Sequence, residues 1–414
     1  MIRVLYIHHA GVFGGASRSL LEMIMAFPKG EVEPVVLLPK GTAMEALKKH
    51  QIQVIPCFGL AQFDNNQYSY YRGLRWLVLL RELFILPFTL AAFWQIRKEI
   101  RNKIDLVHVN EITNLPSLIF AKFFLKKPIV LHVRSLQRNT NGFRKRLISK
   151  LVLRYTKVII AIDHTVQNSL SPILKSYVIH NGFNYKPQMD NKFQKETGNP
   201  ANSTFKVAMV GNPLYLKGVM EFVEAARLSR DNGLNISFHI FGAQNLGKLM
   251  VSKMKAAIGV NQDASHEIAR FIEANALSEV VHLIPFKDDL TEIYSQIDLL
   301  CFPSHLNAVG RPVFEAAYFS KPSIVAIRNP MEDTIIDGVT GIVIEEKNPT
   351  QLFEAIKRLY LNRDELEIMG KNAKKLTEVH FNVTKNSLKV LELYKFSLDL
   401  DYNEHAIFSA ESVK

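Results

Sequence analysis

Short apolar runs alternate along the chain with longer stretches in which apolar residues recur at helical spacing. Five runs with strand character occur in the first half: Val4–Ile7, Val35–Leu38, Leu106–Val109, Ile129–Val133 and Val158–Ile162. Five more follow in the second half: Val207–Val210, Ser237–Phe241, Val281–Leu283, Leu299–Phe302 and Ser323–Ile327. Strands separated by helices form parallel sheets with crossover helices. The pattern therefore predicts an α/β protein with two Rossmann-like, doubly wound domains.

The boundary between the predicted domains falls where large apolar residues almost vanish. Tyr185–Thr204 is rich in Lys, Gln, Asn and Asp and contains two prolines, the composition of a linker. We therefore predict an N-terminal domain over residues 1–188 and a C-terminal domain over residues 189–382. A periodic apolar stretch at about 383–400 predicts a long helix that packs back on the first domain. The tail from Asp401 is expected to fray.

Composition narrows the class of protein. A chain of 414 residues exceeds what one hydrophobic core usually supports, and its apolar content of 48% excludes disorder as the dominant state. Its two cysteines, Cys57 and Cys301, are too few for a disulfide framework, and no Cys/His cluster has zinc spacing. The first eight residues lack the basic stretch and long apolar run of a secretion signal. We expect a cytoplasmic protein with no metal and no cofactor.

Basic residues concentrate in the first half of the chain. Residues 1–189 contain 26 Lys and Arg against 10 Asp and Glu, a net charge of +16, whereas residues 190–414 carry −4. This asymmetry predicts that the first domain meets an anionic surface or ligand, such as a membrane leaflet or a phosphorylated lipid. A solvated surplus of charge explains it too. Nucleic acid is disfavoured because aromatic residues are not interleaved with the basic ones.

The most hydrophobic stretch is Leu74–Trp94. Its uncharged run, Leu83–Trp94, is twelve residues long, which we take as too short to span a bilayer. Flanking tryptophans and nearby arginines fit an interfacial helix kinked at Pro87, bound to the inner face of a membrane. A buried core helix with basic ends fits equally well, and both interpretations stay open.

Two strand ends in the second half carry residues suited to a phosphate ligand. Val210-Gly211-Asn212 ends a strand in a tight turn, and Lys217 then precedes a helix. A lysine at a helix entrance can neutralise phosphate oxygens, and the helix N-terminus adds favourable potential. A surface lysine beside a helix-starting glycine is the ordinary alternative.

The second strand end runs from Cys301 through a loop into a helix whose first turn contains Pro312. The amides of Val309 and Gly310 are expected to point into the crevice at the carboxyl end of the sheet. Glu315 could bind both hydroxyls of a ribose with its two oxygens. Its alternative role is to complement the helix dipole.

Taken together, the motifs resemble the retaining nucleotide-sugar glycosyltransferases of family 4. That family has the GT-B fold, in which two Rossmann-like domains face a central cleft. The resemblance covers nearly the entire chain and rests on the order and spacing of these segments: Gly14–Leu20, Asp105–Val109, Leu131–Arg134, Val178–Gly182, Val210–Asn212 with Lys217-Gly218, His239–Gly242, Asp298–Glu315 and Ile336–Gly341.

The resemblance implies a role for each matching residue. Lys217 would contact the donor diphosphate, Glu315 the ribose, and the Val309 and Gly310 amides the phosphates or sugar. Gly14-Gly15 would form a loop facing the donor phosphates and the acceptor. His132 would lie beside the reacting sugar. Read locally, Gly14-Gly15 is also an ordinary tight turn, and His132 a satisfied histidine at a strand end.

The sequence departs from the family at two positions. Asn307 stands where the first Glu of the usual Glu-x7-Glu pair grips sugar hydroxyls, and Asn212 stands where an Arg usually follows the strand-turn glycine. An amide can still hydrogen-bond a hydroxyl, but without charge assistance. Whether Arg311 replaces the missing phosphate contact stays open.

The leading hypothesis is an enzyme that moves a sugar from a UDP- or GDP-linked donor to a lipid-linked or surface-polysaccharide acceptor, with retention and without metal. Its one Asp-x-Asp, Asp399–Asp401, lies near the tail and is read as a solvated helix end. Two alternatives remain: a catalytically weak nucleotide-sugar-binding subunit, marked by Asn212 and Asn307, and a nucleotide-sugar epimerase of the same architecture.

Overall fold

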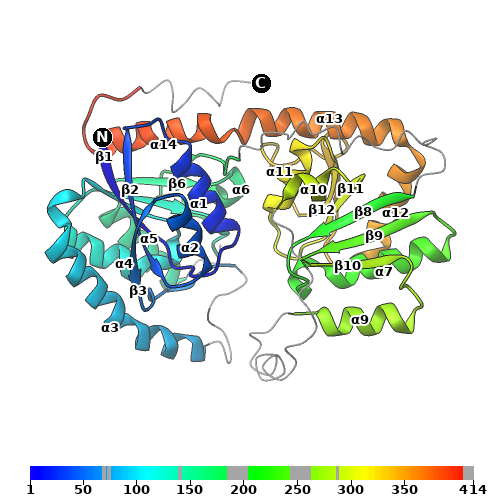
Figure 1. The fold of residues 1–414 in the computed structure, drawn as a ribbon, viewed down its shortest axis with the longest axis horizontal. Helices are drawn as coiled ribbons and strands as arrows, with labels where there is room; N and C mark the ends of the chain where they lie inside the picture. Colours follow the sequence, from blue (N-terminus) through cyan, green and yellow to red (C-terminus); the bar gives the residue numbers. More distant parts are fainter. Residues whose placement is uncertain are drawn as a thin grey trace. The chain divides into compact units, whose positions relative to one another are not determined.

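The computed structural model describes residues 1–67, 71, 76–138, 142–183, 204–242, 263–285 and 289–403 (Figure 1). The chain divides into two compact units, the first made of Met1–Asn184 with His380–Lys414 and the second of Tyr185–Val379. The predicted linker up to residue 203, the start of the apolar stretch at Leu74 and the tail from residue 404 lie outside the described residues.

The first unit contains a parallel seven-stranded sheet in the order β3-β2-β1-β4-β5-β6-β7. Its strands are β1 Ile2–Ile7, β2 Val32–Pro39, β3 Gln53–Cys57, β4 Leu106–Val109, β5 Ile129–Val133, β6 Val158–Ala161 and β7 Tyr177–Val178. The predicted strands are all present. The sequence pattern missed the two edge strands because β3 contains Pro56 and has exposed positions, and β7 spans only two residues.

Helices cover both faces of this sheet. They are α1 Gly15–Met25, α2 Thr42–Lys49, α3 Trp76–Glu99, α4 Leu115–Phe120, α5 Phe143–Tyr155, α6 His164–Ser169 and α14 Val383–Ser397, with the short turns η2 Arg101–Lys103, η3 Ile112–Asn114 and η4 Ala121–Leu125. Helices α1 and α14 share one core with the sheet, in which Leu20, Val130 and Tyr394 are buried. Burying each such side chain contributes about 1.5–3 kcal/mol, so α14 is an integral part of this unit.

The second unit contains a parallel six-stranded sheet in the order β10-β9-β8-β11-β12-β13. Its strands are β8 Phe205–Val210, β9 Ile236–Phe241, β10 Val281–Ile284, β11 Leu299–Phe302, β12 Ser323–Ala326 and β13 Gly341–Ile344. Its helices are α7 Val219–Asp231, α9 Ser265–Ala274, α10 Leu290–Tyr294, α11 Arg311–Tyr318, α12 Pro349–Leu361 and α13 Arg363–His380, preceded by the 3-10 turn η7 Tyr215–Lys217. Strand β13 was not among the strands predicted from the sequence.

Strand order places a crevice in each sheet. The chain starts in the middle of each sheet and reverses direction there, between β1 and β4 in the first unit and between β8 and β11 in the second. Ligands of doubly wound folds bind at the carboxyl ends of the strands beside this reversal. The predicted fold class, two Rossmann-like units, is confirmed.

Helix α3 differs from the prediction in length. It extends over 24 residues, well beyond the uncharged run of the sequence, and is long and apolar enough to cross a membrane as judged by length and composition alone. The exclusion of a span by length was therefore wrong. Arg81 and Glu82 lie within this helix and form an ion pair with each other. Only 17% of its most apolar window is buried, which rules out a core helix within the described residues.

Candidate functional site

The site in the second unit begins with a lysine folded over a glycine. Gly211 directly follows β8 and has a φ of +123°, a conformation that favours glycine. A Cβ at this position would lie 2.6 Å from the Nζ of Lys217. The ammonium group is thus held against the backbone at the carboxyl end of β8, and its burial lowers the pKa of Lys217.

The turn that contains Lys217 packs against the loop after β11 and is hydrogen-bonded to it. Gly218 has a φ of +74°, and a Cβ there would lie 1.9 Å from the Pro303 carbonyl oxygen. The amide of His305 donates to the Leu216 carbonyl at 2.9 Å. The structure therefore brings together the two strand ends that the sequence analysis singled out separately, both within the second unit.

Helix α11 begins at this loop. Gly310 is its N-cap, and a Cβ there would lie 2.3 Å from the Phe302 ring, so a larger residue would force this ring to move. Val309 and Gly310 consequently run close to the end of β11. Backbone amides at the start of a helix favour a negatively charged ligand. The turn that holds Lys217 follows β8, the strand next to β11 in the sheet.

Glu315 is buried on α11, with 4% of its surface exposed. Its Oε2 accepts a hydrogen bond from the Tyr294 hydroxyl at 2.8 Å, and its Oε1 accepts one from Arg311 Nε at 2.6 Å. A buried carboxylate needs such partners to offset its desolvation. Tyr294 escaped the sequence analysis, and Arg311 was considered only as a phosphate contact; its i to i+4 spacing to Glu315 on a helix was the available signal.

The two asparagines that depart from the family lie at different places. Asn307 has a φ of +45°, a conformation that asparagine tolerates better than glutamate, and its Oδ1 accepts a hydrogen bond from the Arg328 amide at 2.7 Å. Its NH2 group is then the part that could meet a ligand. Asn212 is exposed directly after Gly211. Neither side chain supplies a charge to the site.

In the first unit, Gly14 and Gly15 lie at the start of α1. Gly14 is the N-cap in an extended conformation, both residues are exposed, and a Cβ on either would meet no described atom within 4 Å. Neither backbone conformation nor packing within the described residues therefore requires glycine here. The missing side chains leave open space at the carboxyl end of β1.

His132 lies on β5 with 3% of its surface exposed. Its Nδ1 is 3.3 Å from the Nη2 of Arg134, while its buried Nε2 has no hydrogen-bond partner within the described residues. Burial, followed by the charge of Arg134, lowers the pKa of His132 well below 6.5, so the ring is neutral. Buried polar atoms are nearly always paired, so an unpaired one is a candidate for ligand or water contact.

Comparison with known proteins agrees with this architecture. Residues 13–186 match the family model Glycosyltransferase Family 4, and residues 190–376 match Glycosyl transferases group 1. The capsular polysaccharide biosynthesis glycosyltransferase CapM of Staphylococcus aureus is 24% identical over 292 residues, which is 66% of this chain and 72% of CapM. Anabaena Alr3699/HepE, solved in complex with UDP and glucose, is 19% identical, covers 95% of this chain and 99% of its own, and superposes with a TM-score of 0.71.

A second solved structure, sucrose-phosphate synthase from Thermosynechococcus elongatus, has a TM-score of 0.69 at 16% identity, over 96% of this chain and 99% of that one. The fold and the matched families define a glycosyltransferase of the GT-B type. The chain belongs to glycosyltransferase family 4, the glycosyl transferases of group 1.

Proposed function

We propose that this glycosyltransferase transfers a sugar from a UDP- or GDP-linked donor to a lipid-linked or surface-polysaccharide acceptor, with retention of anomeric configuration. The observation that carries the proposal is that the second unit holds the Lys217 ammonium and the α11 N-terminus at the carboxyl ends of adjacent strands, β8 and β11, with the buried carboxylate of Glu315 on α11. Cation and helix end suit a diphosphate, and the carboxylate suits a ribose. The UDP bound by HepE and the capsular role in the name of CapM support donor and acceptor classes.

Retention is proposed to occur by attack on the same face that the leaving group departs from. The departing diphosphate takes the proton of the acceptor hydroxyl, so no side chain has to act as the base. Lys217 and the amides near Val309 and Gly310 stabilise the charge that develops on the phosphate. His132 lies beside the reacting sugar, and Gly14 and Gly15 leave room for phosphates and acceptor.

A catalytically weak binding subunit is the second candidate. It is favoured by the neutral Asn212 and Asn307 and by the fact that both carboxylate oxygens of Glu315 already have protein partners. A ribose would then have to share the Glu315 carboxylate with Arg311 or displace Arg311 from it. Binding of a donor without turnover distinguishes this candidate from the enzyme.

A panel of UDP- and GDP-sugars tests the proposal, because a ligand of the native state raises the melting temperature. We expect one donor to stabilise the protein and to release nucleotide when acceptor is added. Glu315→Gln should weaken the binding of that donor by about 1–3 kcal/mol, the scale of a hydrogen bond to a charged group. Glu354→Gln, on the exposed side of α12, is the matched control. Stabilisation without nucleotide release would support the binding subunit, and no stabilisation by any donor would refute both.

We further propose that the first unit docks on the inner face of an anionic membrane through α3. The inward side of this helix carries polar side chains that form hydrogen bonds with the rest of the unit. Glu82 accepts from the Gln62 amide at 2.8 Å, and Thr89 accepts from the Ala61 amide at 2.8 Å. Both side chains are buried. These bonds, together with the buried side chains of Phe93 and Ile96, hold the helix against the unit.

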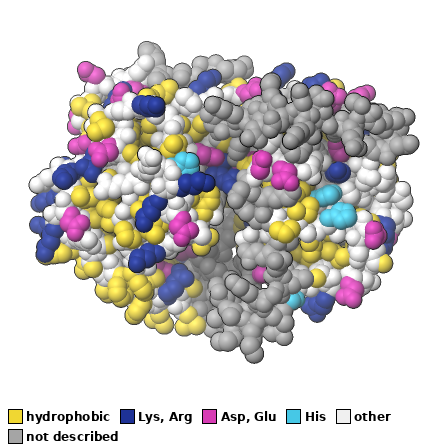
Figure 2. Space-filling model, in the orientation of Figure 1, with side chains coloured by type: hydrophobic (Ala, Val, Ile, Leu, Met, Phe, Trp, Pro, Cys, Tyr) yellow, Lys and Arg dark blue, Asp and Glu magenta, His cyan; other side chains and the backbone are white. Residues whose placement is uncertain are grey.

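The outward side of α3 is apolar and flanked by positive charge. Large apolar side chains are 40–65% exposed along it: Trp76, Leu77, Leu80, Leu83, Phe84, Phe88, Leu90 and Trp94. Arg97 and Lys98 lie over the Trp94 ring at 5.9 and 5.3 Å from its centroid. Figure 2 shows apolar and basic side chains gathered over the position of this helix. Exposed apolar surface of this extent is typical of an interaction site, and the basic flank favours anionic lipid.

Sedimentation with anionic liposomes tests the docking. Binding should fall with salt, since each basic side chain near the surface contributes on the order of 1 kcal/mol of screened attraction. The apolar face should leave a salt-resistant remainder that disappears when Leu83, Phe84 and Phe88 are replaced by Gln. Replacing Leu361 and Ile368, equally exposed in the second unit, by Gln should change nothing. Wild-type protein that stays in the supernatant at low salt would refute membrane docking.

A further inference from the structure

A buried chain of hydrogen bonds links the carboxyl ends of three strands in the first unit. Arg134, directly after β5, lies at its centre. Its Nε donates to Asn110 Oδ1 at 2.8 Å, its Nη1 donates to Asn181 Oδ1, and its Nη2 faces His132 Nδ1 at 3.3 Å. Asn110 then contacts His8 Nδ1 at 3.0 Å. The arginine thus joins the segments after β4, β5 and β7 around one histidine.

The chain has a single possible direction, because a guanidinium group can only donate. Nδ1 of His132 must accept, so its proton is on Nε2. Oδ1 of Asn110 must accept, so its NH2 group faces His8 and Nδ1 of His8 accepts. His8 Nε2–H then donates to Ser17 Oγ at 2.8 Å. Each tautomer follows from the donor-only chemistry of Arg134, and His8 and Asn110 are fully buried.

The far end of the chain reaches the glycine loop. The Ser17 hydroxyl donates to the Val12 carbonyl at 3.2 Å, and these two residues bracket Gly14 and Gly15. One network therefore ends at His132 on one side and holds both flanks of the exposed glycines on the other. A change at Arg134 would be transmitted in both directions.

His132 lines a small cavity between the sheet, α1 and α14. Its other lining residues include Ser19, His180, Asn181, Asn386 and Ser387, and none of the described residues that line it is acidic. The titratable groups that face His132 are Arg134, His180 and His108 on β4, whose ring centroid is 5.4 Å away. Tyr394 of α14 contacts His108 Nδ1 at 2.8 Å. These surroundings offer an imidazolium no counter-ion, so they disfavour protonation.

We propose that Arg134 is a positioning residue that holds His132 as the neutral Nε2–H tautomer and ties the Gly14-Gly15 loop to it. The inference rests on the proposed function, in which His132 lies beside the reacting sugar. His132 then donates a hydrogen bond from Nε2 to a substrate oxygen and does not act as a base. Arg134 acts through His132 and the loop, without touching substrate itself.

The first test is the tautomer, observed by NMR of the full chain labelled with 15N-histidine. Long-range 1H–15N correlations distinguish Nδ1–H, Nε2–H and imidazolium forms, and His132→Gln and His8→Gln assign the signals. Wild-type protein should show both rings as Nε2–H at pH 7 and still neutral at pH 5.5. An imidazolium or an Nδ1–H form of His132 at pH 7 would overturn the proposal, whether or not a sugar donor has been found.

The second test separates positioning from plain stability. Arg134→Met removes every donor and should release the tautomer preference of His132 and lower kcat by on the order of ten- to a hundredfold, the range for losing an orienting partner, with donor KM little changed. Arg134→Lys, which keeps a cationic donor, should recover part of both. If Arg134→Met folds, as judged by circular dichroism, and keeps tautomer and kcat, the proposal fails. If Arg134→Met does not fold, the His132 tautomer in the NMR spectrum of the wild-type protein decides whether the proposal holds.

Discussion

Lys217 is held over Gly211 instead of extending into solvent, and the proposed function assigns its charge to the departing diphosphate. We predict that Lys217→Ala lowers turnover by roughly two to three orders of magnitude, the scale for losing one preorganised electrostatic stabiliser. Steady-state kinetics with the donor found in the panel would measure it. Lys371→Ala, an exposed lysine paired only with Glu367 on the same helix, should keep wild-type rates. Wild-type turnover in Lys217→Ala would remove the lysine from the mechanism.

Buried histidines make the stability of the protein depend on pH. Burial lowers the pKa of His8 from 6.5 to about 3, and it lowers the pKa of His108 and His132 well below 6.5. Below pH 6.5 the unfolded chain binds protons that the folded chain excludes, so this stabilisation is complete above pH 6.5 and is lost as the pH falls. Burial raises the pKa of Glu111 from 4.5 to about 7, and its stabilisation is lost in the opposite direction, as the pH rises through 7.

His8, His108 and His132 outweigh Glu111 between pH 6.5 and 5, and His9 and His239, whose pKa is also lowered by burial, act in the same direction as these three histidines. We predict that the free energy of unfolding falls with decreasing pH by on the order of 2 kcal/mol per pH unit, since each net proton contributes about 1.4 kcal/mol per unit. Urea titrations at pH 7 and 5.5 would measure this. Glu111→Gln should make the decline steeper, because the opposing titration is removed. Equal stability at both pH values would show that these rings are accessible to protons.

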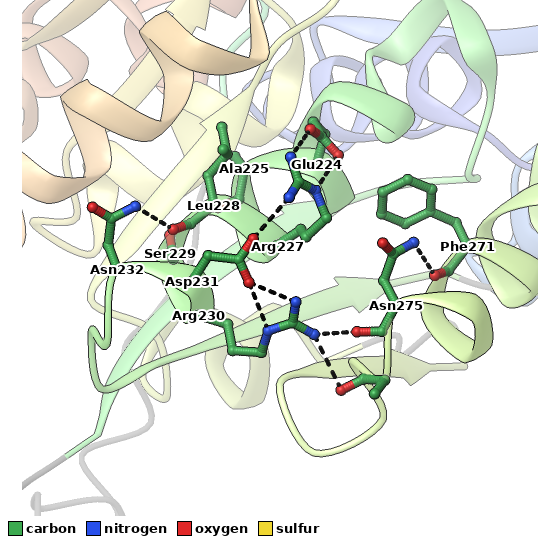
Figure 3. A network of polar contacts seen from close by, with 11 residues as sticks. Glu224, Ala225, Arg227, Leu228, Ser229, Arg230, Asp231, Asn232, Phe271 and Asn275 are labelled. Carbon is green, nitrogen blue, oxygen red and sulfur yellow. Dashed lines mark hydrogen bonds and ion pairs between the residues drawn. The ribbon is translucent and has the colours of Figure 1, made fainter.

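At the scale of elements, a surface network connects α7 to the end of α9 (Figure 3). Arg230, in the last turn of α7, bonds Asp231 on its own helix and donates to the carbonyl of Asn275, the C-cap of α9. Among the residues that the structure describes, Arg227 bonds Glu224 and Asp231, which lie on α7 as well. The two arginines thus differ in whether they join two elements.

We predict that Arg230→Ala lowers the free energy of unfolding by about 1 kcal/mol, because a helix-terminal carbonyl loses its partner. Arg227→Ala should cost less than about 0.5 kcal/mol, the scale of exposed pairs within one helix. Urea unfolding of both variants under identical salt would compare them. A larger loss in Arg227→Ala would mean that the ion pairs within α7, and not the link to α9, control this region.

Helix α3 shows how an element can mislead when it is read alone. Its apolar residues surround the helix almost uniformly, so periodicity could not separate an interfacial helix from a core helix. The distinction came from Glu82 and Thr89, whose hydrogen bonds to a distant loop select the inward side. These polar residues therefore mark the inward side of the helix, together with the buried Phe93 and Ile96.

For the whole molecule we predict activity without a divalent metal. Within the residues that the structure describes, no group of three or more His, Cys, Asp or Glu side chains could hold an ion. Lys217 and the α11 N-terminus supply the positive potential that a metal would otherwise provide. The initial rate should be unchanged after exhaustive chelation. A rate abolished by chelator and restored by Mg²⁺ or Mn²⁺ would contradict this, with the unchanged melting temperature of the chelated protein as the control for folding.

The sequence by itself determined the class of the fold and the order of its motifs. Strand runs such as Val4–Ile7 and Val207–Val210 and the turn at Gly211 depend on residues close in the chain, where periodicity and glycine conformation act directly. Lys217 and Glu315 were predicted as site residues from their places next to helix entrances, and their roles remain proposals. Edge strands with mixed burial, such as β3, were missed because their pattern is weak.

Only the tertiary structure decided which of these residues act together. Arg134 meets Asn110 across 24 residues of sequence, and Asn110 meets His8 across 102, because strand order and register place β4 between β1 and β5. The partnership of Tyr294 with Glu315 likewise depends on how α10 and α11 lie on the second sheet. Hydrogen bonds between distant segments leave no period in the sequence, since each partner need only be polar and correctly placed once the sheet has formed.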